Sequence, residues 1–259
     1  MKPFLLCALL FVLLALPVVA QAEEITVAAA SDLSFVFGEI ATRFQQETGN
    51  SVKLSFGSSG NFYSQIQNGA PYDIFFSADV EYPKKLEEAG LIEPGTLYEY
   101  ASGKLVLWAP NDSKIDVQQG LKCLLDPRVR KIAIANPAHA PYGRAAEAAL
   151  KKAGLYDKVS SRLVLGENIS QTAHFVETGN AEVGLIALSL ALAPEMKGRG
   201  TYYLVPRELY SPIVQGAVIL KSSANKKTAR RFLEFIKSPA ISNLMKQYGF
   251  ESPESSSPR

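Results

Sequence analysis

The feature of this 259-residue sequence that most constrains its fold is a regular alternation of short apolar segments with helix-forming segments. Short apolar segments that each lead into a helix signal predict an α/β fold with mainly parallel sheets. We expect strands at residues 25–30, 52–56, 73–77, 105–109, 132–135, 162–165 and 183–186, and returning strands at 202–205 and 214–220. We expect helices at 35–47, 63–67, 83–89, 145–152, 170–177, 188–192 and 226–236, and a short last helix that ends at Gly249.

The length and the connections predict two lobes rather than one sheet. No linker rich in Pro, Gly or Ser separates two halves of the chain, so we expect strands that cross between lobes near residues 103–105 and 215–217. The predicted division is lobe 1 at 23–103 plus 216–250, lobe 2 at 104–215, and a disordered tail at 251–259, where Ser and Pro are abundant.

The first 22 residues indicate export. They hold Lys2, an apolar run over residues 4–16 and the small-residue ending Ala20-Gln21-Ala22. This run is shorter than the roughly 20 apolar residues that span a bilayer. A positive start, a short apolar run and a small-x-small end are typical of a cleaved secretory signal. We predict a signal peptide over residues 1–22 and a periplasmic mature protein, with an uncleaved anchor as the alternative.

Charge and motif content exclude several classes of function. The 27 Lys+Arg and 25 Asp+Glu give a net charge of +2, which provides no basic field for nucleic acid. After residue 22 the sequence has one cysteine, Cys123, and two distant histidines, His139 and His174, which do not make a zinc ligand set. The nucleophile-elbow, zincin and P-loop motifs are missing from the sequence. We therefore predict no resident cofactor and no enzymatic activity.

Small polar residues gather in the turns that join predicted strands to predicted helices. Ser31 and Asp32 follow the first strand, and Gly57-Ser58-Ser59-Gly60 follows the second. Later turns of the same kind lie at residues 136–143, 167–170 and 187–189. Parallel sheets bring such turns together at the carboxyl ends of their strands, where ligands bind.

These turns favour an anion site built from dipoles. The first turn of a helix offers unpaired N–H groups and the positive end of the helix dipole. Two glycines around two serines let the backbone curl its N–H groups inward. In most proteins, a Ser or Asn before a helix caps that helix and binds no ligand. The Gly-Ser-Ser-Gly turn differs, because two glycines around two serines are more than one cap requires. Asp32 and Glu167 would oppose an anion if their carboxylates pointed inward, and we expect each to complement a helix dipole and to offer its N–H.

Seven segments resemble the periplasmic molybdate-binding proteins of ABC transporters, which are type II periplasmic solute-binding proteins. The segments lie in matching order at residues 28–33, 56–60, 69–79, 103–108, 136–143, 166–169 and 184–189. The resemblance covers residues 25–250. It implies a two-lobed receptor in which each lobe is a mostly parallel sheet flanked by helices, with the ligand cleft between the lobes. It also implies a monomer that captures molybdate or tungstate and delivers it to a membrane permease.

The resemblance further implies which residues hold the oxyanion. Carried over position by position, they are the hydroxyls of Ser31 and Ser59 from lobe 1 and the backbone N–H groups of Tyr142 and Ile169 from lobe 2. Asp32 and Ser58 are expected as additional contacts, and no protein atom bonds molybdenum directly. Some family members add a tyrosine hydroxyl at the position of Ala187, so here the remaining donors must complete the shell.

Three alternatives stay open at this stage. The first is a receptor of the same fold for another oxyanion such as sulfate, whose rejection depends on cavity size. The second is an amine receptor that uses Asp32 and Glu167 as counter-charges, and the third is an exported enzyme that uses His139 as an acid–base group. A fully ionised tetrahedral dianion only accepts hydrogen bonds, so a pocket that offers only donors suits it. Protonated phosphate also donates a hydrogen bond, so a site for it would need an acceptor as well.

Overall fold

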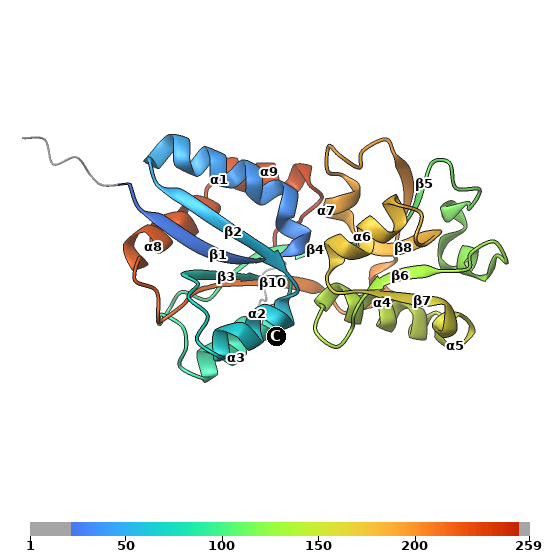
Figure 1. The fold of residues 1–259 in the computed structure, drawn as a ribbon, viewed down its shortest axis with the longest axis horizontal. Helices are drawn as coiled ribbons and strands as arrows, with labels where there is room; N and C mark the ends of the chain where they lie inside the picture. Colours follow the sequence, from blue (N-terminus) through green and yellow to red (C-terminus); the bar gives the residue numbers. More distant parts are fainter. Residues whose placement is uncertain (1–21, 254–259) are drawn as a thin grey trace, which may run out of the picture.

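The computed structural model describes residues 22–253, which form two lobes side by side along the long axis (Figure 1). The predicted signal peptide lies outside the described residues except for Ala22, and residues 254–259 of the predicted tail lie outside them as well. Each lobe contains one five-stranded sheet with helices packed on it. The predicted two-lobed α/β architecture is thereby confirmed.

The first sheet has the strand order β2-β1-β3-β10-β4. β1 is parallel to β2 and β3, whereas β10 is antiparallel to both of its neighbours. Its elements are β1 (Glu24–Ala30), α1 (Ser34–Thr48), β2 (Ser51–Gly57), α2 (Ser59–Gln67), β3 (Ile74–Ser77), α3 (Glu81–Glu88), β4 (Tyr98–Gly103), β10 (Ile213–Ile219), α8 (Lys226–Ile236) and α9 (Pro239–Gln247).

The second sheet has the strand order β7-β6-β8-β5-β9, and here β5 is antiparallel to both of its neighbours. Its elements are β5 (Leu105–Pro110), β6 (Ile132–Ala135), α4 (Pro141–Lys152), α5 (Tyr156–Val159), β7 (Leu163–Gly166), α6 (Ile169–Glu177), β8 (Val183–Ala187), α7 (Leu188–Ala191) and β9 (Gly200–Leu204). Four short 3₁₀ segments complete the described elements: Ser31–Leu33, Val117–Leu125, Ser160–Arg162 and Arg207–Leu209.

The expectation of mainly parallel sheets needs correction at the two strands that join the lobes. β4 ends at Gly103 and β5 begins at Leu105, so the chain changes sheets within one residue. On its return, β10 pairs with Gly103 from Ile213 onward, two residues before the crossing predicted at 215–217. A strand that enters a sheet from the other lobe has no helical crossover to reverse its direction, and it therefore runs against its neighbours. The sequence pattern also missed β4, an edge strand with polar residues.

Each lobe has its own apolar core. In lobe 1, Phe37 and Phe44 are both buried residues of α1. The ring of Phe37 packs edge to face against the ring of Phe76, with 4.8 Å between the ring centroids. Phe76 in turn meets Phe232 of α8 at 6.0 Å. In lobe 2 the sheet buries Trp108 almost completely. Separate cores let the lobes keep their shape while the angle between them changes.

Glu251, the first residue of the predicted tail, is part of the fold. Glu251 pairs with the backbone of Ser102, and its carboxylate forms ion pairs with Lys104 and Arg207. β4 is an edge strand, and its free backbone groups pair with Glu251. The Ser- and Pro-rich sequence of the segment gives no sign of this partner, because the partner lies far away in the chain. No helix within residues 22–253 is long and apolar enough to cross a membrane.

Candidate functional site

The six residues predicted for the site line one cavity between the lobes: Ser31, Asp32, Ser58, Ser59, Tyr142 and Ile169. The lobe 1 residues follow the carboxyl ends of β1 and β2, and the lobe 2 residues lie in the first turns of α4 and α6. The cavity volume is about 10 Å³ for the centre of a water molecule, which is room for about one water. A tetrahedral oxyanion can therefore enter only if the lobes separate.

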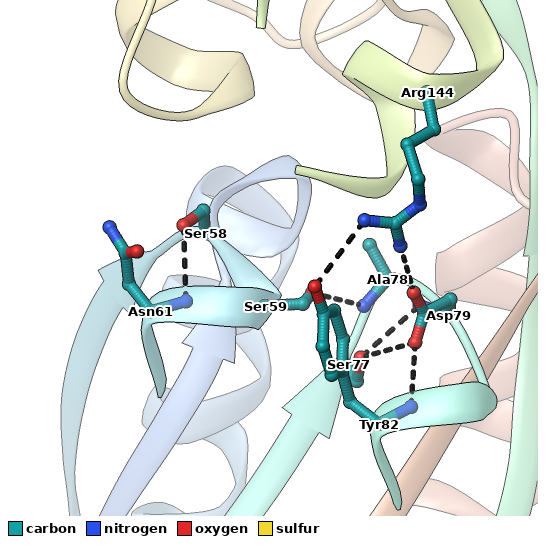
Figure 2. A network of polar contacts seen from close by, with 8 residues as sticks. All are labelled: Ser58, Ser59, Asn61, Ser77, Ala78, Asp79, Tyr82 and Arg144. Atoms are coloured by element: carbon teal, nitrogen blue, oxygen red, sulfur yellow. Dashed lines mark hydrogen bonds and ion pairs between the residues drawn. The ribbon is translucent and has the colours of Figure 1, made fainter. Parts of the chain in front are cut away.

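Ser59 is fully buried, and its bonding prepares it to donate (Figure 2). Its Oγ accepts the backbone N–H of Ala78 at 2.9 Å. Because one lone pair is used in this way, the hydroxyl proton is free to point to another acceptor. The neighbouring Ser58 is the N-cap of α2 and accepts the N–H of Asn61 at 3.4 Å. Capping therefore accounts for Ser58 but not for Ser59.

Ser31 connects the first lobe to the start of α6. Its Oγ donates to Asn168 Oδ1 at 3.2 Å and accepts the N–H of Ser170 at 3.3 Å. Asn168 is the N-cap of α6, and Ile169 is the first residue of that helix. The N–H of Ile169 has no acceptor within the helix, because the residue four positions earlier, whose carbonyl would accept it, lies outside the helix. Ser31 and this donor thus meet at the same end of the cavity.

The start of α4 is the second helix end at the cavity. Ala140 precedes the helix in extended conformation without a side-chain cap, and Pro141 occupies the first helical position. Tyr142 and Gly143 follow, and their N–H groups have no helical acceptor. A Cβ on Gly143 would lie 2.2 Å from the carbonyl oxygen of Ala135, so only glycine lets the helix start this close to β6.

Asp32 lies in the first turn of the 3₁₀ segment Ser31–Leu33, as expected of a helix-start acid, and its side chain also belongs to a buried polar network. Its side chain is 1% exposed, and Oδ2 accepts Gln215 Nε2 at 2.6 Å. Gln215 also donates to the Tyr142 hydroxyl at 3.3 Å and accepts the Tyr100 hydroxyl at 2.7 Å. Burial raises the pKa of Asp32 to about 6, against the opposing effect of hydrogen bonds from Gln215 and Tyr142. The site therefore includes a carboxyl that titrates near neutrality.

Gln215 and Tyr100 were not predicted as site residues, because neither lies in a turn between a strand and a helix. One sequence signal could have found Gln215, which is the only polar side chain in the apolar run at residues 213–220 and is fully buried. A buried amide needs hydrogen-bonding partners, and in this chain they are a carboxyl and two phenols from other elements. Tyr100 had no such signal.

Glu167 does not contribute the N–H that we expected from it. Its backbone N–H donates to Gln171 Oε1 at 2.7 Å, and its exposed carboxylate accepts Asn61 Nδ2 at 2.7 Å. Ala187 is buried without a hydroxyl, and the nearby Ser189 Oγ donates to the backbone carbonyl of Asp32 at 2.8 Å. The missing tyrosine donor is therefore not replaced by Ser189.

Direct contacts between the lobes surround the cavity. Arg144 of α4 forms an ion pair with Asp79 and donates to the hydroxyl of Tyr82 at 3.3 Å (Figure 2). Next to Tyr82, Gly60 N–H donates to the His139 carbonyl at 2.9 Å, and His139 Nδ1 lies 2.9 Å from Ser58 Oγ. These contacts place the two lobes in a closed arrangement.

Metal coordination by side chains has no support in the part of the chain that the structure describes. Within residues 22–253 no group of three or more His, Cys, Asp or Glu side chains could hold a metal ion. Cys123 is buried, and burial raises the pKa of its thiol to about 11, so the thiolate form is rare.

Comparisons with known proteins agree with this geometry. Residues 25–251 match the family model described as bacterial extracellular solute-binding protein. A molybdate-binding protein ModA of Rhodobacter capsulatus is 40% identical over 237 residues, which covers 92% of this chain and 91% of that protein. The ModA of Azotobacter vinelandii is 42% identical over 231 residues, 89% of this chain and 91% of that protein. The solved periplasmic molybdate-binding protein of Azotobacter vinelandii has a TM-score of 0.84 at 38% identity and covers 89% of this chain and 100% of that one.

Proposed function

This chain belongs to the family of bacterial extracellular solute-binding proteins that includes the ModA molybdate-binding proteins, and from that premise we propose how it works. It is a binding protein that captures molybdate and delivers it to the permease of an ABC transporter. The resemblance seen in the turn motifs is thereby confirmed. Molybdate is cargo in this function, and the protein uses no cofactor. We further propose that it also takes tungstate, acts as a monomer in the periplasm, and catalyses no reaction.

The observation that carries the proposal is the convergence of donors from both lobes on one cavity. Lobe 1 supplies the hydroxyls of Ser31 and Ser59, and lobe 2 supplies the N–H groups of Tyr142 and Ile169. The N–H of Asp32 and the residue Ser58 add further contacts. Four oxygens of a tetrahedral dianion can each accept from such donors, and helix N-termini add a favourable dipole. All contacts go to oxygen, so no protein atom bonds the molybdenum.

Capture proceeds by closure of the lobes. The oxyanion first meets the hydroxyls of lobe 1, and rotation of lobe 2 then brings the starts of α4 and α6 onto it. The ion pair of Arg144 with Asp79 and the bond from Gly60 to His139 form only when the lobes meet. Ligand binding shifts the population toward this closed arrangement because the lobe 2 donors reach the oxyanion only there.

The enzyme alternative has one specific observation in its favour. His139 lies between Ser58, at 2.9 Å, and the carboxylate of Glu167, at 3.6 Å, in a serine–histidine–acid order. The outer distance is too long for a hydrogen bond, and Glu167 is bonded to Asn61 instead. The group also forms across the closed lobes, where the cavity leaves room for about one water. An ester or peptide substrate is larger than a four-oxygen anion and would hold the lobes further apart than the anion does.

Calorimetric titration of the mature protein tests the proposal. Molybdate and tungstate should bind tightly, and sulfate and phosphate should give little heat at the same concentrations. A thermal shift series with the four anions checks the result independently, because a ligand stabilises the state that it binds. Equal affinity for sulfate would exclude a molybdate-specific receptor and favour the general oxyanion alternative. Hydrolysis of ester substrates that is lost in His139→Gln would favour the enzyme.

A further inference from the structure

The buried carboxyl of Asp32 has no part in a site made of donors, and we propose that it couples oxyanion capture to protonation. When the dianion binds, the protein takes up one proton from the solvent on the Asp32 carboxyl, so the complex holds the oxyanion beside a neutral acid. This inference rests on the proposed function and adds a chemical requirement to the same site.

Asp32 is a residue of the proposed site, and only one of its two carboxyl oxygens has a hydrogen-bond partner in the described chain. Asp32 lines the same cavity as Ser31, Ser59 and Tyr142. Its Oδ2 is held by Gln215, whereas Oδ1 is buried and has no hydrogen-bond partner among residues 22–253. A buried carboxylate oxygen without a partner is costly, and a proton on a carboxyl removes the charge that makes it so.

The groups around Asp32 offer no positive charge to balance it. Gln215 from β10, the phenols of Tyr142 from α4 and Tyr100 from β4, and the Ser189 hydroxyl from α7 surround it. No ion pair to Asp32 occurs within the described chain. Burial raises the pKa of both phenols well above the ordinary value, so they stay neutral.

The charged groups at the edge of the cavity are engaged with one another. Arg144 pairs with Asp79, and His139 lies between Ser58 and Glu167. Of the groups that contact Asp32 directly, none can supply or remove charge near neutral pH. The Asp32 carboxyl is therefore the group whose charge can respond to a bound dianion.

Electrostatics then fixes the direction of the coupling. Two negative charges in a water-poor site repel strongly, and a like charge favours the neutral acid. Burial, against the opposing hydrogen bonds, already raises the pKa of Asp32 to about 6, and the dianion raises it further. The protonated form thus binds more tightly. Affinity should be constant below about pH 6 and fall up to about tenfold per pH unit above it, until the pKa of the complex is reached.

Isothermal titration with molybdate in several buffers of different ionisation enthalpy counts the protons. At about pH 7.5 the wild-type protein should take up close to one proton per molybdate bound. Asp32→Asn should take up none, and its affinity should not depend on pH between about 6.5 and 8.5. His139→Gln is the matched control, because His139 contacts Ser58 of the cavity wall, and this variant should still take up the proton.

Two outcomes overturn the inference: molybdate binding by the wild-type protein without proton uptake, or equal uptake by Asp32→Asn. A wild-type protein that binds no molybdate at any pH would instead exclude the proposed function. If Asp32→Asn does not fold, infrared spectroscopy of the wild type decides, because the carbonyl band of a protonated carboxyl should appear when molybdate is added. Absence of that band in a saturated complex also overturns the inference.

Discussion

The two lobes contribute different kinds of donor to the proposed site. Lobe 1 presents side-chain hydroxyls, Ser31 and Ser59, which a single substitution can delete. Lobe 2 presents main-chain N–H groups at Tyr142 and Ile169, which every residue except proline possesses. The comparison teaches that the lobe 1 half depends on residue identity, whereas the lobe 2 half depends on where two helices begin.

The largest effect should come from preventing the lobes from meeting, through Gly60→Val. A Cβ at Gly60 would lie 2.7 Å from the His139 carbonyl oxygen across the cleft. Overpacking against backbone costs about 3 kcal/mol at the top of its usual range, so molybdate affinity should fall about 150-fold. Calorimetry measures this loss, and small-angle scattering should show that molybdate no longer compacts the protein.

Gly38→Ala is the control for Gly60→Val, because a Cβ at Gly38 meets nothing within 4 Å. It should bind as the wild type does. The melting temperature of ligand-free Gly60→Val should stay close to wild type, because the nearest lobe 1 atom to its Cβ is the Tyr82 hydroxyl, the movable end of a side chain. Wild-type affinity in Gly60→Val would show that binding does not need this closure.

Ser59→Ala should cost about 1–3 kcal/mol of binding, or about 5- to 150-fold in Kd, because a charged acceptor loses a buried donor. The same change leaves the Ala78 N–H without its acceptor, so ligand-free stability should fall as well. Titration and thermal unfolding separate the two effects. Ser64→Ala, on the exposed face of the same helix, is the control. An unchanged Kd would remove Ser59 from direct contact with the oxyanion.

Ile169→Pro tests the lobe 2 half by deleting an N–H group. Proline is tolerated at the first position of a helix, and Asn168 before it is already extended at φ −152° and ψ 176°. We expect a loss of about 1–3 kcal/mol in binding, similar to Ser59→Ala. Ile169→Ala keeps the N–H but loses the buried side chain, so the difference in Kd between the two variants isolates the donor. No difference would contradict a backbone contact at this residue.

Tyr142→Phe should have the smallest effect, because this residue is proposed to act through its N–H and not through its hydroxyl. The hydroxyl accepts a long hydrogen bond of 3.3 Å from Gln215. Molybdate affinity should change by less than about threefold, which is about 0.6 kcal/mol. A loss as large as that of Ser59→Ala, measured by the same titration, would mean that side chains matter in both lobes.

Local signals explain how much of the molecule could be predicted. Strand, turn and helix follow one another in sequence, so the sheets and the meeting of Ser31, Ser59 and Tyr142 at one cavity were predictable. The ligand roles of these residues stay a prediction. The directions of β5 and β10 were not predictable, because they depend on where the chain crosses between lobes. The contact of Gln215 with Asp32 joins residues 183 positions apart, and no local pattern reports such a distance.

The position of Glu251 shows where a fluorescent label can report on the angle between the lobes. This residue joins the edge of β4 to Lys104 and Arg207, beside both segments that connect the lobes. Glu251 and the exposed Ser252 therefore lie beside the segments that join the lobes. An environment-sensitive dye attached at Ser252 would follow the angle between the lobes. Ser252 is thus an attachment point for a fluorescent sensor of molybdate.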